Sequence, residues 1–218
     1  MDPDFWLKRW QANEIGFHQD KVQPALAKHW PELKVARSSR VFVPLCGKSL
    51  DMTWLADQGH MVLGSDLTEL AADAYFHERG QTASVRDVNG FTIKSSGPVE
   101  IWCGDFFALT RDHINATAAY DRAALVAMPP EMQKKYADKL AELMPFASQT
   151  LLIGLDYKQS EMKGPPFAVP RAQVHALFDS DFDVTLIEAR DGLAKSDHLA
   201  KRGVTYLEEA TYLLRRRP

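Results

Sequence analysis

Short apolar runs alternate with amphipathic stretches along most of the chain. Residues 40–45, 61–64 and 150–155 are apolar or β-branched on both faces, a pattern typical of fully buried strands. Residues 99–103 and 118–121 have the same character, and helical periodicity is found at 50–56, 69–79 and 131–144. Ser49 is a suitable N-cap for the first of these helices, and Gly59 follows its end. The alternation predicts right-handed crossovers and a parallel sheet.

The two ends of the chain differ from this central part. At the N-terminus, residues 4–12 carry Phe5, Trp6 and Trp10 in a helical pattern that Asp2 or Asp4 could cap, and a second helix is expected at 22–30. Near the C-terminus, residues 182–189 and 204–215 alternate like strands with no helical pattern between them, which predicts an antiparallel edge. The fold class is therefore α/β, a doubly wound, mostly parallel sheet with an antiparallel C-terminal edge strand.

Bulk properties narrow the classes of function. The chain has 218 residues, and we expect one domain over 1–218 with an N-terminal helical lid at about 1–35. A net charge of −3 with interspersed signs favours neither nucleic acid nor a membrane surface as partner. Two isolated cysteines argue against a disulfide framework or a structural zinc site, so no metal is expected. Without a long apolar segment, a cytoplasmic monomer is the expectation.

The carboxyl ends of strands are where an open α/β sheet binds ligands. Gly47 directly follows the first of these strands and leaves room for a ligand to approach the backbone. Gly47-Lys48-Ser49 resembles the end of a phosphate-binding P-loop, but Phe42 occupies the position of the required first glycine. The chain also lacks GxGxxG at this turn, so a ligand without phosphates fits better.

Two acids at neighbouring strand ends suggest a nucleoside ligand. Asp66 lies 19 residues after Gly47, close to the spacing at which an acid accepts from both ribose hydroxyls, although it could instead cap the helix near Glu69. Asp105 could accept from an adenine amino group beside Phe106, or it could be an N-cap followed by two core phenylalanines. The occurrence of suitable residues at neighbouring strand ends favours a nucleoside site over a chance placement of helix caps.

Arg122 follows the next predicted strand. A guanidinium facing a ligand site needs an anionic partner, which a carboxylate of the bound ligand or a substrate heteroatom would supply. The alternative is that Asp121 and Arg122 pair with neighbouring charges. The basic run at 215–217 is interpreted as a solvated strand end.

Several segments resemble those of the bacterial thiopurine S-methyltransferase family, nearly from end to end. The most specific is Pro44-Leu45-Cys46-Gly47-Lys48, which replaces the usual glycine-rich methyltransferase loop. The further matching segments, in order, are Trp10, Gly16-Phe17-His18-Gln19, Asp121-Arg122-Ala123-Ala124 and Gly164-Pro165-Pro166-Phe167.

This resemblance implies a class I methyltransferase fold that binds S-adenosylmethionine and releases S-adenosylhomocysteine. Its implied acceptors are small molecules: thiopurines, aromatic or heterocyclic thiols and, as bacterial relatives suggest, selenium and tellurium species, with roles in selenium metabolism and tellurite resistance. The residues on cofactor-contacting positions are Trp10, Leu45, Asp66 and Arg122, with Asp105 and Phe106 at the adenine and Phe17 at the acceptor. Asp66 departs from the family, which often has glutamate there.

A thiolate of low pKa can take a methyl group from a sulfonium without a dedicated base. We therefore expect Arg122 to stabilise the acceptor anion, while Trp10, Phe17 and residues 165–167 close over it; Trp10 and Phe17 could alternatively pack on the core. The C-terminal segment 195–203, which contains Arg202, is a second region where the acceptor could bind. A nicotinamide-dependent oxidoreductase and a non-catalytic sensor of S-adenosylmethionine or a nucleoside are the alternatives.

Overall fold

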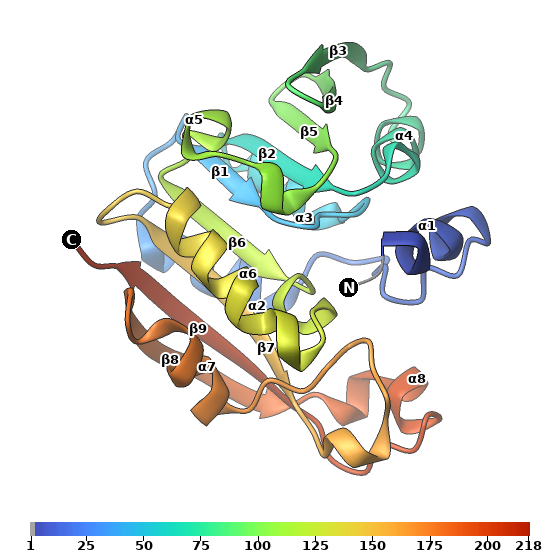
Figure 1. Ribbon diagram of the computed structural model, residues 1–218, viewed down its shortest axis with the longest axis vertical. Helices are drawn as coiled ribbons and strands as arrows, with labels where there is room; N and C mark the ends of the chain where they lie inside the picture. The colour runs from blue at the N-terminus through green and yellow to red at the C-terminus, as the bar shows by residue number, and fades with distance from the viewer. Residues whose placement is uncertain (1–2) are drawn as a thin grey trace. The chain divides into compact units, whose positions relative to one another are not determined.

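A computed structural model describes residues 3–218, except for the side chains at 195, 197 and 198 (Figure 1). The suggested cap by Asp2 lies outside the described residues. The chain forms two compact units, Met1–Tyr120 and Asp121–Pro218, and each is described by itself. Whether residues 1–218 act as a single domain stays a prediction.

The first unit is built on a sheet that is parallel at its centre. Its strand order is β3 (Ser84–Val88), β4 (Phe91–Ser96), β5 (Val99–Cys103), β2 (Met61–Asp66), β1 (Arg40–Val43) and β6 (Ala118–Arg122), of which the last two residues belong to the second unit. β1 pairs in parallel with both β2 and β6, and β2 pairs in parallel with β5. β3 and β4 form an antiparallel hairpin on β5, which the sequence interpretation did not include.

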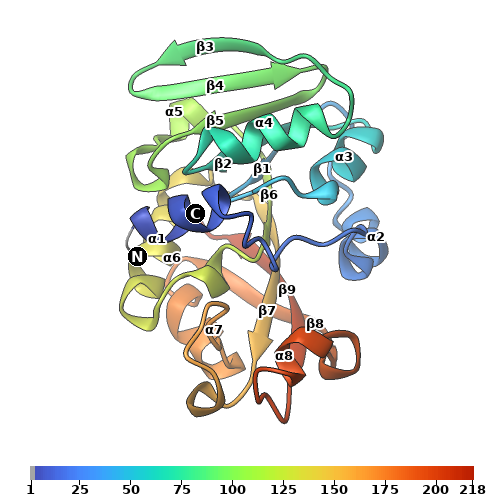
Figure 2. The same ribbon diagram turned by 90° about the vertical axis from the view of Figure 1, so that its right-hand side faces the viewer.

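Short helices connect these strands. Those of the first unit are α1 (Pro3–Gln11), α2 (Pro24–His29), the 3₁₀ helix η1 (Trp30–Leu33), α3 (Leu50–Asp57), α4 (Glu69–His77), the 3₁₀ helix η2 (Phe106–Ala108) and α5 (Arg111–Ile114). Ser49 caps α3 as predicted, because its side chain accepts from the N–H of Asp51. α4 lies against the strands β4 and β5 (Figure 2), where the buried Lys94 on β4 pairs with Glu69 at 2.9 Å and Asp73 at 2.6 Å.

The second unit contains an antiparallel sheet in the order β7 (Gln149–Asp156), β9 (Glu208–Arg216) and β8 (Phe182–Asp191). The helix α6 (Pro130–Leu143) lies beside α7 (Arg171–Phe178) (Figure 1). The remaining short helices are η3 (Leu125–Ala127), η4 (Gln159–Glu161), η5 (Leu193–Lys195) and α8 (Asp197–Ala200). The predicted antiparallel pairing of the last two strands is confirmed. The expectation of no helix between them was wrong, since α8 interrupts the connection and β9 begins only at Glu208.

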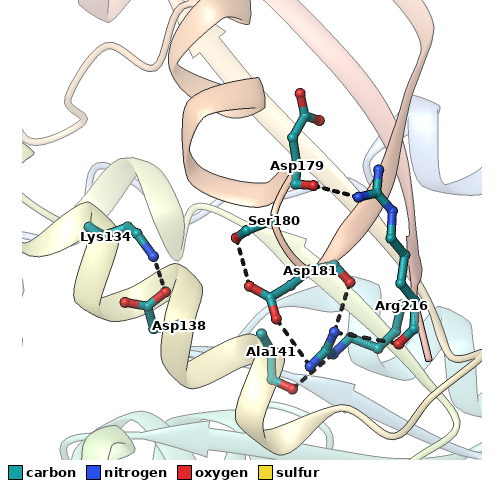
Figure 3. Close-up of polar contacts among 8 residues, drawn as sticks. Lys134, Asp138, Ala141, Asp179, Ser180, Asp181 and Arg216 are labelled. Atoms are coloured by element: carbon teal, nitrogen blue, oxygen red, sulfur yellow. Dashed lines mark hydrogen bonds and ion pairs between the residues drawn. The ribbon is translucent and has the colours of Figure 1, made fainter.

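Arg216 fastens the end of β9 to its surroundings in the second unit. Figure 3 shows its guanidinium donating to the backbone carbonyls of Ala141, at the end of α6, and of Asp181, before β8. It also pairs with the carboxylate of Asp181 at 3.2 Å. The basic run at 215–217 does end a strand, but its central arginine binds the protein rather than solvent.

The predicted α/β class with an antiparallel C-terminal edge is confirmed by this topology. Among residues 3–218, every helix is too short or too polar to cross a membrane. The side chains that the structure describes include no cluster of three or more His, Cys, Asp or Glu residues able to hold a metal ion.

Candidate active site

The turn after β1 has two residues in the left-handed backbone region. The φ angle is 48° at Leu45 and 53° at Gly47. Glycine adopts such angles readily, whereas leucine does so only where its surroundings hold it there. The N–H of Cys46 donates to the carbonyl of Ser65 on β2 at 2.8 Å, which fixes the turn against the neighbouring strand. Backbone strain of this kind concentrates at ligand sites, so the turn is the first component of the candidate site.

Asp66, the last residue of β2, binds this turn directly. Its Oδ2 accepts from the N–H of Gly47 at 2.8 Å, and its Oδ1 accepts from the N–H of Thr68 at 3.2 Å. The N-cap of α4 is Thr68, whose hydroxyl accepts from the N–H of Leu70. The alternative in which Asp66 caps that helix was therefore wrong. Its carboxylate instead joins the ends of two adjacent strands.

The carboxylate of Asp66 keeps the capacity to accept more hydrogen bonds. A carboxylate has about four acceptor sites, more than the backbone N–H groups of Gly47, Thr68 and Leu67 use, and 8% of the residue is exposed. Burial raises the pKa of Asp66 to about 6, while hydrogen bonds, first that from Gly47, act to lower it. A ligand that donates two hydroxyls would meet a charged acceptor above this pKa.

This pKa predicts pH-dependent ligand binding. Below about pH 6 the side chain of Asp66 takes up a proton and loses acceptor capacity, so affinity should fall as the pH falls. We expect the Kd for S-adenosylhomocysteine to rise about tenfold from pH 8 to pH 5 in calorimetric titrations, if only the ionised form binds. Asp121→Asn should keep this dependence, because it removes a different buried carboxyl whose pKa is also raised to about 6. A flat profile would contradict the assignment.

Trp10 and Phe17 belong to a partly exposed aromatic cluster at the N-terminus. Trp10 lies against the turn, since a Cβ at Gly47 would be 3.5 Å from its Cζ2 atom. The ring centroid of Phe17 lies 5.8 Å from that of Trp10 and 5.5 Å from that of Trp6. No residue of α1 is buried, although its rings are large and apolar. The alternative of simple core packing therefore does not describe this cluster, which leaves aromatic surface beside the turn.

Asp105 and Phe106 follow β5, at the same end of the sheet as Asp66. Asp105 is exposed and caps η2, with its Oδ1 accepting from the N–H of Phe107 at 2.9 Å. The ring of Phe106 is buried and stacks on Phe42 at 6.4 Å between centroids. The side-chain positions thus match the N-cap and core interpretation, and the second oxygen of Asp105 is available to a ligand as well. Adenine binding here stays a prediction.

Lys48 and Glu78 form a contact that sequence reasoning missed. The ammonium of Lys48 lies 2.5 Å from Glu78 just beyond α4, and only 12% of the lysine side chain is exposed. The hydrogen bond from Lys48 lowers the pKa of Glu78. Because Lys48 already has an anionic partner, it is not placed as a P-loop lysine would be. The pair connects the turn to the C-terminal end of α4, and no sequence signal links positions 30 residues apart.

Arg122 lies in the second unit, at the carboxyl end of β6, and is half-buried. The residue before it, Asp121, is fully buried and accepts from the hydroxyl of Tyr136 at 2.6 Å and from the N–H of Leu125 at 3.3 Å. Ala123, the residue after it, has a φ of 68°, a second case of non-glycine strain at a strand end. These contacts fix the backbone on both sides of Arg122.

Within the first unit, the candidate residues fit a nucleoside without a pyrophosphate. Asp66 offers acceptors for ribose hydroxyls, Asp105 offers an exposed acceptor, and Trp10 supplies an aromatic face. A pyrophosphate must approach the backbone closely at several positions, and each of these positions requires a glycine. The turn has only one glycine, Gly47. S-adenosylmethionine is such a ligand, because it contains a nucleoside with two ribose hydroxyls and has no phosphate.

Two solved methyltransferases share this fold. A 1,6-didemethyltoxoflavin-N1-methyltransferase from Burkholderia thailandensis, solved with 1,6-didemethyltoxoflavin and S-adenosylhomocysteine, has a TM-score of 0.67 at 15% identity, covering 99% of this chain and 87% of that one. An arsenic(III) S-adenosylmethionine methyltransferase from Chlamydomonas reinhardtii has a TM-score of 0.57 at 15% identity, covering 84% and 65%. The fold is thus that of the S-adenosylmethionine-dependent methyltransferases.

Sequence similarity identifies the family within this fold. The family model of thiopurine S-methyltransferase matches residues 1–217, and the chain belongs to this family. It is 48% identical to a thiopurine S-methyltransferase of Pseudomonas fluorescens (strain Pf0-1), covering 99% of each chain. It is also 48% identical to one of Methylococcus capsulatus, covering 99% of this chain and 98% of that one. The predicted family and its cofactor, S-adenosylmethionine, are confirmed.

Proposed function

We propose that this protein transfers the methyl group of S-adenosylmethionine to the sulfur of thiopurines and of aromatic or heterocyclic thiols. The observation that carries the proposal is the family match over residues 1–217, together with relatives of the same length at 48% identity.

The chemistry needs little from the protein beyond binding and alignment. When bound, S-adenosylmethionine supplies a methyl group on a positively charged sulfur. In this proposal Asp66 holds the ribose, Leu45 and Gly47 shape the turn beside it, and Trp10 covers the turn. Arg122 stabilises the anionic acceptor, so an acceptor of low pKa requires no general base.

The acceptors could extend beyond sulfur to selenium and tellurium. Selenium and tellurium species would be soft, polarisable acceptors like a thiolate, and they need no base for the same reason. We extend the proposed acceptors to them, and place the protein in the cytoplasm as a monomer. These points rest on the resemblance to bacterial relatives.

Parallel calorimetric titrations with S-adenosylmethionine, S-adenosylhomocysteine, NADH and ATP test the cofactor. We expect binding of the first two ligands only, because the turn after β1 lacks the glycines that admit a pyrophosphate. Methyl transfer to thiophenol, 6-mercaptopurine, a selenol and tellurite then tests the acceptor. Preferential binding of NADH or ATP would contradict the proposal. Tight binding of S-adenosylmethionine without transfer to any acceptor would favour a sensor instead.

A further inference from the structure

The loop 163–168 in the second unit is held by hydrogen bonds at its last four residues, 165–168. The buried hydroxyl of Tyr157 donates to the carbonyl of Pro166 at 2.6 Å. The guanidinium of Arg202 donates to the carbonyl of Pro165 at 3.1 Å. Prolines cannot donate from the backbone, so their carbonyls are the polar groups through which side chains can fix this segment.

Gln159 completes the attachment from the other side. Its Oε1 accepts from the N–H of Ala168 at 2.9 Å, and its Nε2 donates to the carbonyl of Met162 at 2.7 Å. The same Nε2 lies 3.1 Å from the hydroxyl of Tyr157. Tyr157 and Gln159 therefore form one connected set of hydrogen bonds that holds the loop, and the loss of either side chain leaves partly buried polar groups without these bonds.

Two backbone bonds place this loop at the ends of two strands. The N–H of Phe167 donates to the carbonyl of Val126, four residues beyond Arg122, at 2.6 Å. The N–H of Val169 donates to the carbonyl of Leu155, next to the last residue of β7, at 2.7 Å. The carboxyl ends of strands are the ligand-binding edge of an open α/β sheet. The loop therefore borders the edge on which Arg122 lies.

The loop presents an apolar surface there. Pro165, Pro166 and Phe167 all keep part of their surface exposed. Phe167 turns back over Gly164, where a Cβ would lie only 2.6 Å from its ring. Such a surface suits the flat face of an aromatic thiol.

We infer that Tyr157 and Gln159 are positioning residues that hold residues 164–167 as a fixed apolar wall for a planar aromatic acceptor. This inference rests on the proposed function. It assigns the loop a different role from the closing lid expected from the sequence: hydrogen bonds from Tyr157 and Gln159 fix the loop to the rest of the second unit, so it forms a wall. Binding then costs little ordering at this side of the acceptor.

The test is Tyr157→Phe, which removes the hydroxyl and keeps the ring. Thiophenol affinity is measured by calorimetry in the presence of S-adenosylhomocysteine, so no methyl transfer is needed. We expect the Kd for thiophenol to rise about fivefold, as for the loss of one hydrogen bond, while the Kd for S-adenosylhomocysteine stays within about twofold. Amide exchange at Phe167 and Ala168 should become faster. Tyr206→Phe, at an exposed tyrosine, is the matched control and should change neither affinity.

Gln159→Met gives an independent variant of similar length without donors or acceptors, and it should reproduce the loss of thiophenol affinity. Unchanged thiophenol affinity in both folded variants would overturn the inference. So would an equal loss of affinity for S-adenosylhomocysteine, which would indicate a general structural role, or the absence of thiol binding to the unsubstituted protein. Thiol binding without methyl transfer would instead contradict the proposed function and leave the wall supported.

Discussion

Replacing Asp66 by asparagine is expected to weaken the binding of S-adenosylmethionine about 100-fold. Hydrogen bonds to a charged group contribute roughly 1.5–3 kcal/mol each, and a ribose would donate two of them. Asparagine also introduces an NH₂ group next to the N–H of Gly47 or Thr68, where both carboxylate oxygens now accept. The variant therefore loses a ligand contact and disturbs the turn that shapes the site.

Calorimetric titration with S-adenosylhomocysteine measures this effect without turnover. A thermal melt monitored by circular dichroism verifies that the variant is folded, and Asp87→Asn, at an exposed position on β3, is the matched control that should bind normally. If folded Asp66→Asn binds within about threefold of the unsubstituted protein, the carboxylate does not hold the ribose. The Asp66–Gly47 bond would then be purely structural.

The junction of β1 and β2 shows how far sequence reasoning reached. Two buried strands, a glycine after the first and an acid after the second were enough to place Gly47 and Asp66 together, because parallel neighbours end at the same edge of a sheet. The choice between ribose acceptor and helix cap could not be made from spacing. Thr68 is an equally good cap two residues later, and the structure shows that it serves in that role.

The β3–β4 hairpin was missed although a signal was present. Asn89-Gly90 is the strongest short hairpin turn sequence, and φ is 48° and 85° at these residues. β3 itself is largely exposed, so it lacks the apolar pattern by which the buried strands were recognised. The turn chemistry should have taken precedence over the missing periodicity.

Some backbone conformations and long-range hydrogen bonds near the site cannot be predicted from the local sequence. The left-handed backbone at Leu45 and Ala123 contradicts the preferences of both residue types and exists only because tertiary contacts impose it. Likewise, the bond from Tyr157 to Pro166 depends on how the loop folds back after β7. Resemblance to a family pointed to these regions, but only coordinates show which atoms fix them.

Replacing Arg122 by alanine is expected to lower kcat/KM for an aromatic thiol about 100-fold. A hydrogen bond from a guanidinium to a bound thiolate contributes roughly 1.5–3 kcal/mol, and its loss lowers kcat/KM because this ratio is measured against free enzyme and free thiol. The hydroxyl of Tyr136 holds Asp121 on one side of Arg122, and the left-handed backbone of Ala123 is constrained on the other. The backbone that carries the guanidinium is therefore fixed. Arg122→Lys keeps the charge without the planar donor pair and should recover only part of the rate.

Steady-state kinetics with varied thiophenol at saturating S-adenosylmethionine measure this effect. Arg215→Ala, at an exposed arginine of the same unit, is the control and should leave kcat/KM unchanged. Because Arg122 stabilises the anionic acceptor, the loss should be at least as large for a thiol of higher pKa, which is mostly protonated in solution and depends on this stabilisation to bind as a thiolate. A loss within about twofold, or under roughly 0.4 kcal/mol, would remove Arg122 from the acceptor site. An equal loss of affinity for S-adenosylhomocysteine would assign it to the methionyl carboxylate instead.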